Sequence, residues 1–100
     1  MDSLTKALNI LDDLDRHHVY PHRYLAYQIK MLDDDVAVKH ILTRLATRAS
    51  YENQPSLVMA AFEAAPTHVR LEFDRENGSV RKITAGEMLN EMRALKHIKA

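Results

Sequence analysis

The sequence predicts an α+β fold: a small, mostly helical domain with one antiparallel β-hairpin followed by a C-terminal helix. Three observations support this class. Apolar residues recur at helical spacing over residues 3–65, strict alternation follows at 68–73, and a helix-capping motif comes after a second short strand. Since 100 residues allow one modest core, we expect residues 1–100 to form a single compact domain.

The first two helices are expected before the aspartates at 33–35. One runs from Ser3 to about Arg16, with Asp2 or Ser3 as its N-cap. Its apolar stripe consists of Leu4, Ala7, Leu8, Leu11 and Leu14. The other runs from about Pro21, a residue that suits the first turn of a helix, to Leu32. Its core face consists of Leu25, Ile29 and Leu32.

The third helix is expected from about Asp35 to Ser50, because aspartate is a good cap and acid is favourable at a helix N-terminus. The alternative is one helix from Pro21 to Arg48, but the phase of the apolar stripe changes across the aspartates. The fourth helix runs from Pro55 to about Ala65, where Pro66 ends it. Its sequence is apolar nearly all round, which predicts a buried helix.

The hairpin is predicted from alternation and from a turn signal. Val69, Leu71 and Phe73 alternate with polar residues, which is the period of a half-buried strand. Asn77-Gly78 then marks a turn between two strands.

The register of the hairpin follows from the faces of its side chains. Pairing Phe73 with Val80 brings two apolar groups together and places Glu72 opposite Arg81, with a loop at 75–78. Because Val80 and Ile83 are three residues apart, we expect the second strand to bulge near Arg81 or to end early.

Thr84 followed by Glu87 is a capping box, which predicts a last helix from about Ala85 to His97. One face of that helix carries Met88, Met92 and Leu95. Two strands alone are marginally stable and leave an unpaired edge. We therefore expect a homodimer that pairs the hairpins, or packs the last helices together, about a two-fold axis.

Composition excludes several classes of protein. The 14 basic and 14 acidic residues cancel, which argues against a protein whose main work is to hold nucleic acid or an anionic membrane. Cysteine is absent, so a disulfide scaffold, thiol catalysis and zinc–cysteine sites are excluded. No apolar run reaches the ~20 residues that span a bilayer. The N-terminus lacks the apolar core of a signal peptide, so we expect a cytoplasmic location and no membrane contact.

No catalytic, metal or nucleotide motif stands out. His17, His18 and His22 cluster near two aspartates, but Pro21 interrupts the helix that would align them, so a solvated joint is favoured over a metal site. The aspartates at 33–35 lack the glycine and distal glutamate of a calcium loop. No serine lies in a nucleophile motif, and the 2 glycines cannot build a phosphate loop. We therefore expect a non-enzymatic protein without a cofactor.

Two groups of residues are candidates for binding a partner. Tyr24 and Tyr27 lie beside the core face of the second helix, and tyrosine is enriched in interfaces, although this strip also suits the rim of a core. Arg81 and Lys82 on the hairpin are the weaker candidate, because a basic pair acts mainly by electrostatic steering.

The same order of elements also fits a winged-helix DNA-binding regulator. Its wing would carry Arg70, Arg75, Arg81 and Lys82. Such a module reads DNA with the helix before the wing, and here that helix has Glu63 as its only charge. Nucleic acid is therefore less favoured than protein as the partner. The sequence favours a small regulatory, adaptor or inhibitor protein that acts through contacts with a protein partner.

Overall fold

The computed structural model describes residues 2–17, 19–46, 53–74 and 78–99, with side chains up to residue 94. The predicted class, a small and mostly helical α+β fold with a helix after the hairpin, is confirmed. In order, the described elements are α1 (Ser3–Arg16), α2 (His22–Lys30), α3 (Asp35–Leu45), α5 (Pro55–Ala64), β1 (Arg70–Asp74), β2 (Val80–Thr84) and α6 (Ala85–Lys99).

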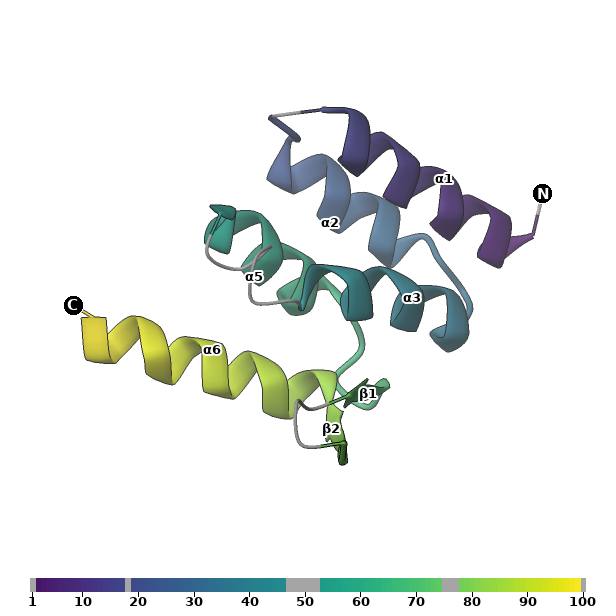
Figure 1. Cartoon of the computed structure of the whole chain (residues 1–100). Helices are drawn as coiled ribbons and strands as arrows, with labels where there is room; N and C mark the ends of the chain where they lie inside the picture. The colour runs from purple at the N-terminus through teal and green to yellow at the C-terminus, as the bar shows by residue number, and fades with distance from the viewer. Residues whose placement is uncertain (1, 18, 47–52, 75–77, 100) are drawn as a thin grey trace.

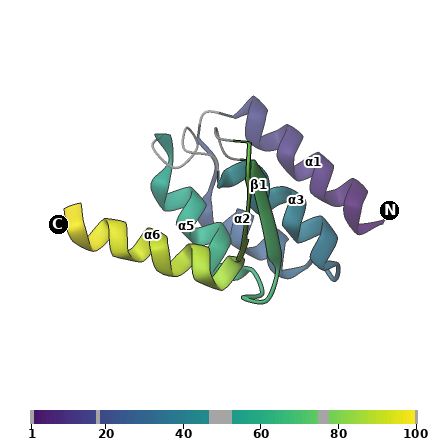
Figure 2. The same cartoon turned by 60° about the horizontal axis from the view of Figure 1, so that its bottom comes forward.

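The elements lie in three tiers (Figure 1). α1 and α2 are at the top of this view, α3 and α5 in the middle, and the hairpin with α6 at the bottom. α1 packs along α3 and α2 along α5, while β1 lies against α3 and α6 against α5 and β2. Figure 2 brings the hairpin end forward and shows α6 leading away from the base of the two strands. The middle tier therefore separates the α1–α2 end of the molecule from the hairpin end.

The core fills the space between these tiers. Its largest fully buried side chains come from α2, α3, α5 and β1, and they are Leu25, Ile29, Val38, Ile41, Leu42, Val58, Phe62 and Leu71. The burial predicted for the apolar fourth helix is confirmed, since α5 places Phe62 at its centre and packs on both α2 and α6.

Helix ends follow the caps that the sequence indicates. Asp2 accepts a hydrogen bond from the Thr5 backbone N–H (2.7 Å) at the start of α1, and Asp34 accepts one from Val36 (2.8 Å) at the start of α3. Two separate helices, α2 and α3, are therefore confirmed in preference to one long helix. α2 is shorter than predicted, from His22 to Lys30. Of the predicted third helix, residues 47–50 lie outside the described residues.

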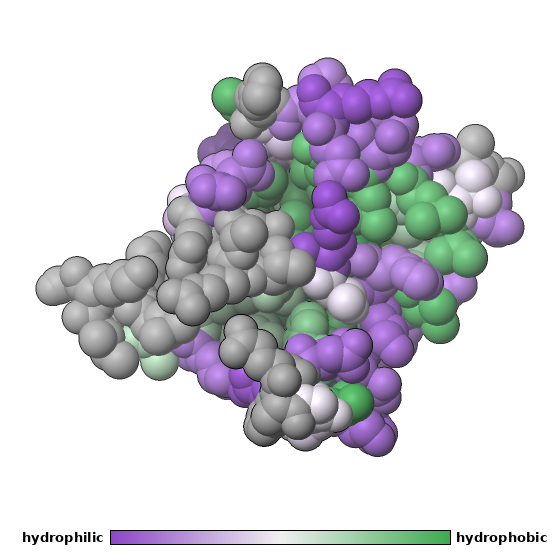
Figure 3. Space-filling view, in the orientation of Figure 1, coloured by the Kyte–Doolittle hydropathy of each residue, from purple (hydrophilic) through white to green (hydrophobic). Residues whose placement is uncertain are grey.

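The apolar stripe of α1 is only partly buried, which corrects the predicted core. Ala7 and Ile10 are buried, whereas Leu4 and Leu8 are 41% and 52% exposed. The reason is that the buried line of α1 runs through Ala7 and Ile10, and Leu4 and Leu8 lie to one side of it. Figure 3 shows apolar surface gathered on the right, over α1 and α3. The exposed aliphatic side chains of those helices are Leu4, Leu8 and Val36.

The predicted register of the hairpin is wrong by one residue. Phe73 faces Arg81 rather than Val80, and Glu72 faces Lys82. Asp74 pairs with Val80, so the connection is longer than predicted, and residues 75–77 within it lie outside the described residues. Gly78 has a φ of +82°, the left-handed region that glycine enters without strain.

The second strand pairs continuously, so the predicted bulge or early end is also wrong. Leu71 and Ile83 face each other and are both buried, which fixes the inner face of the hairpin. Val80 then falls on the outer face and is 51% exposed. Arg81 follows onto the inner face as a result, and its guanidinium pairs there with a carboxylate on α6, Glu91.

The capping box that starts α6 is confirmed. The Thr84 N–H donates to Glu87 Oε1 (3.2 Å), and the Glu87 N–H donates to Thr84 Oγ1 (3.2 Å). The next two N–H groups bond to the chain before β1, Ala85 to the Val69 carbonyl (2.7 Å) and Gly86 to the Thr67 carbonyl (3.0 Å). The start of α6 therefore has its amides satisfied within the protein.

Candidate protein-binding surface

α2 has two apolar faces, and only one of them is buried. Leu25 and Ile29 are buried against the core, as predicted. Tyr24, Tyr27 and Met31 lie on the adjoining side and are 52%, 60% and 60% exposed. Large apolar side chains at this exposure, gathered on one helix, are typical of surfaces that a partner covers. We call these three residues the tyrosine face.

Tyr20 belongs to the core rather than to this face. Its side chain is buried, and its hydroxyl donates a hydrogen bond to Gln28 Oε1 at 2.7 Å. Burial raises the pKa of Tyr20, and the bond to Gln28 offsets part of that increase. The Tyr20 ring stacks on Tyr24, with ring centroids 5.9 Å apart. Tyr20 therefore supports one side of the exposed Tyr24 ring and limits its rotamers.

A groove of about 300 Å³ separates the tyrosine face from α1. The wall opposite the tyrosines is lined by Lys6, Ile10 and Asp13 of α1. Since α1 packs mainly along α3 and α2 mainly along α5, the two helices leave this space between them. The structure thus adds α1 residues to the predicted surface, a set that the sequence of α2 alone does not reveal.

The basic pair of the hairpin lies at the other end of the molecule (Figure 1). Arg81 donates a hydrogen bond from Nη2 to Glu91 Oε2 of α6, which raises the pKa of Arg81. Lys82 is exposed and lies opposite Glu72 in the strand register. Arg81 is therefore engaged within the protein, and the hairpin presents a less concentrated positive charge than its sequence indicates.

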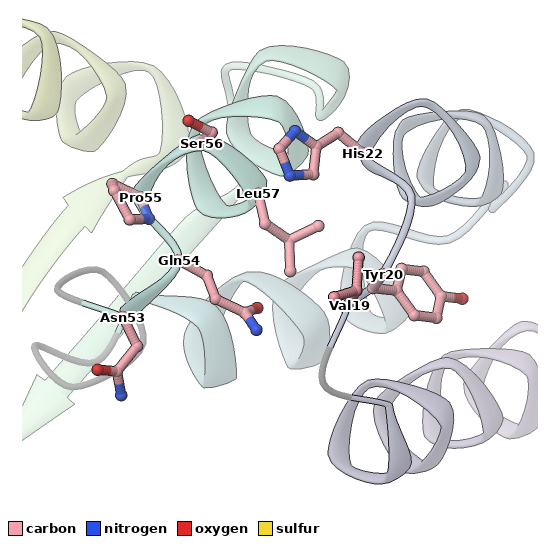
Figure 4. A pocket seen from close by; sticks show the side chains of 8 residues that line it. All are labelled: Val19, Tyr20, His22, Asn53, Gln54, Pro55, Ser56 and Leu57. Atoms are coloured by element: carbon pink, nitrogen blue, oxygen red, sulfur yellow. The ribbon is translucent and has the colours of Figure 1, made fainter.

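A second hollow, of about 270 Å³, lies between the α1–α2 connection and the start of α5. Figure 4 shows His22 and Leu57 projecting into this space from α2 and α5, while the Tyr20 ring points away from it. The hollow holds one imidazole, that of His22, and the hydroxyl of Ser56. Among the described residues that line the hollow, the other titratable side chain is that of Tyr20, whose ring points away from His22.

Among the described residues, no group of three His, Asp or Glu side chains is placed to hold a metal ion. His18 lies outside those residues. No helix in the described part of the chain is long and apolar enough to cross a membrane.

The chain has no match among protein-family models, curated proteins or solved structures.

Proposed function

We propose that this protein is a small non-enzymatic regulatory, adaptor or inhibitor protein that acts through protein–protein contacts. The observation that carries the proposal is the exposure of Tyr24, Tyr27 and Met31 beside a groove. Tyrosine and methionine supply large contact areas, and a tyrosine ring costs little conformational entropy when it is immobilised. The stack on Tyr20 favours this role further, because it holds one ring in place before a partner arrives.

Arg81 and Lys82 form the second, weaker part of the proposed contact surface. Because Arg81 already pairs with Glu91, its contribution is steering of an approaching acidic surface rather than a buried anchor. A cytoplasmic location and the absence of enzymatic activity remain predictions from the sequence.

The rival function, a winged-helix-like DNA-binding regulator, is less well supported by the geometry. The helix before the hairpin is α5, which packs on α2 and α6 and exposes Pro55, Ser56 and Glu63. It offers no basic side chain to a phosphate and no amide side chain to a base.

The two functions are separated by a gel shift with random duplex DNA and by affinity capture from the native host. We expect no shift at about 0.15 M salt, and capture of a protein by the wild-type chain. A shift that weakens steeply as salt rises, with no protein captured, would favour the DNA-binding function instead.

We also propose that the protein is a homodimer. The hairpin is a two-stranded sheet, so strand edges remain available, and Val80 is exposed on its outer face. The apolar stripe predicted on α6 does not support a dimer. Met92 packs in the core, and the side chain of Leu95 lies outside the described residues. Light scattering at micromolar concentration should give twice the 11.5 kDa of one chain, and a mass of 11.5 kDa would contradict the dimer.

A further inference from the structure

Four exposed aliphatic side chains lie around α3, apart from the tyrosine face. Leu4 and Leu8 belong to α1, which packs along α3, and Val36 belongs to α3 itself (Figure 3). Val80 of β2 is also exposed and lines a hollow beside α3. Apolar groups that gather in one area of a surface, rather than lying singly, are typical of a face that another molecule covers.

The hollow lies between α3 and the hairpin and measures about 560 Å³. α3 and β1 pack side by side (Figure 2), and His68 Nε2 lies 2.7 Å from Asp35 Oδ2 where α3 begins. The lining forms two walls. The α3 wall consists of Val36, Lys39, His40, Thr43 and Arg44, and the hairpin wall consists of Glu72, Asp74 and Val80.

The two walls carry opposite charges. Lys39 and Arg44 lie on the α3 wall, and Glu72 and Asp74 lie on the hairpin wall, so the two basic and two acidic groups cancel. Arg44 already pairs with Asp15 at 2.6 Å. Within the part of the chain that the structure describes, the side chains of Lys39, Glu72 and Asp74 form no ion pair. The lining is therefore neutral in sum but polarised from one wall to the other.

Two further cations on the hairpin argue against a partner of one strong charge. Lys82 lies opposite Glu72 in the strand register, and Arg70 precedes Glu72 by two residues on the same strand. Both are exposed, and neither lines the hollow. Because they offset the hairpin carboxylates, this surface has no net field to attract a distant cationic or anionic partner. Its complementarity lies in the arrangement of the two walls.

A second copy of this chain matches that arrangement. An isologous interface must be complementary to itself, because both copies contribute the same patch. A two-fold axis that lies in the surface between the two walls exchanges them. The basic wall of one copy then faces the acidic wall of the other, and the same pairing occurs twice. A balanced and polarised patch fulfils this condition, whereas a patch of one sign would repel its own copy.

We infer that two copies of this chain associate through the α3–hairpin face. Lys39 of one protomer lies against Glu72 and Asp74 of its partner, and the contact also covers Val36 and Val80. This inference rests on the homodimer proposed above, because it names the surface through which that dimer forms. The tyrosine face lies outside this contact and stays open to a different protein.

The test is a reciprocal charge reversal, followed by light scattering at micromolar concentration. Lys39→Glu alone and Glu72→Lys alone each place like charges at both contacts of a homodimer. Each variant should weaken the dimer about tenfold or more and shift its mass toward the 11.5 kDa of one chain. In an equimolar mixture, positions 39 and 72 carry opposite charges at both contacts of a mixed dimer. The mixture should therefore recover twice the mass of one chain.

Two further variants make this test independent of the folding of the reversed chains. Val36→Asp places a charge in the apolar part of the contact, and it should keep its fold because acid is favourable in the first turn of a helix. It should also dissociate the dimer. Lys30→Glu, an exposed position on α2, makes the same change of net charge away from the hollow and should leave the dimer intact.

The outcomes separate this inference from the homodimer itself. If the wild type is a dimer and both Val36→Asp and the charge reversals retain its mass, the homodimer stands and the α3–hairpin face is wrong. The same conclusion follows if the reversals are folded monomers whose mixture stays monomeric. If the wild type itself has the mass of one chain, both the homodimer and this surface are contradicted.

Discussion

The two ends of the molecule treat their surface side chains differently. At the hairpin end, the prominent polar groups are used within the protein: Thr84 and Glu87 cap α6, and Arg81 pairs with Glu91. At the α1–α2 end, Tyr24, Tyr27 and Met31 remain largely exposed beside a groove. Folding alone accounts for side chains whose hydrogen-bond or ion-pair partners lie within the chain. Large apolar side chains that remain exposed on one face are those that the proposed partner would cover.

The sharpest way to test this contrast is to compare stability losses at the two ends. Leu71 on β1 is fully buried, and Leu71→Ala should lower the free energy of unfolding by about 2–5 kcal/mol. Phe73 on the same strand is half-buried, so Phe73→Ala should cost less than the ~3–5 kcal/mol expected of a buried ring. Tyr27→Ala should change stability by less than about 0.5 kcal/mol. Urea denaturation measures all three, and a loss for Tyr27→Ala as large as that for Leu71→Ala would make Tyr27 a core residue.

A smaller effect is expected from the capping box. Thr84→Ala removes the Oγ1 acceptor of the Glu87 N–H and should cost about 0.5–2 kcal/mol. Thr84→Ser is the matched control, because it keeps the hydroxyl and should retain most of the stability. Equal stability of the Ala and Ser variants in thermal unfolding would show that the box contributes nothing.

The same box should make stability depend on pH. Hydrogen bonds from the Thr84 side chain and backbone lower the pKa of Glu87 below its ordinary 4.5. A carboxylate whose pKa is lowered by folding stabilises the protein above the unfolded pKa, and this share is lost as pH falls through the folded pKa. Stability should therefore decline below about pH 4.5.

Glu87→Gln is the control for this pH dependence, because glutamine can complete the box but does not titrate. The stability of this variant should fall less steeply at low pH than that of the wild type. Some loss should remain, because a hydrogen bond from the Thr5 N–H lowers the pKa of Asp2 at the start of α1 in the same way. Parallel pH profiles for the two proteins would rule out the linkage at Glu87.

The fold was largely predictable because the residues that begin and end its helices lie close to those ends in the sequence. Asp2, Pro55 and the Thr84–Glu87 pair act within one helical turn, so the sequence alone reveals them. The hairpin register was not predictable in the same way. It depends on burying Leu71 and Ile83 together against the helices, a tertiary requirement that outweighs the local preference for pairing Phe73 with Val80.

The candidate site was predictable in part for a similar reason. Tyr24 and Tyr27 could be found because they lie beside the core stripe of their own helix. The place of Tyr20 in the core could not be predicted in this way, because it depends on burial and on a tertiary hydrogen bond to Gln28. The groove could not be predicted either, because it depends on where α1 lies relative to α2. Exposure of Leu4 and Leu8 was missed because their spacing matches that of core residues.

The most direct test of the central claim is quantitative capture of the partner by two double variants, at low salt and at about 0.15 M salt. Both variants must first give the circular dichroism of the wild type. We predict that Tyr24→Ala/Tyr27→Ala loses the partner at both salt concentrations, because it removes buried contact area. Arg81→Glu/Lys82→Glu should lose it chiefly at low salt, because it removes steering. Capture that survives loss of both tyrosines but disappears in the charge variant at both salt concentrations would contradict the account and place the contact on the hairpin.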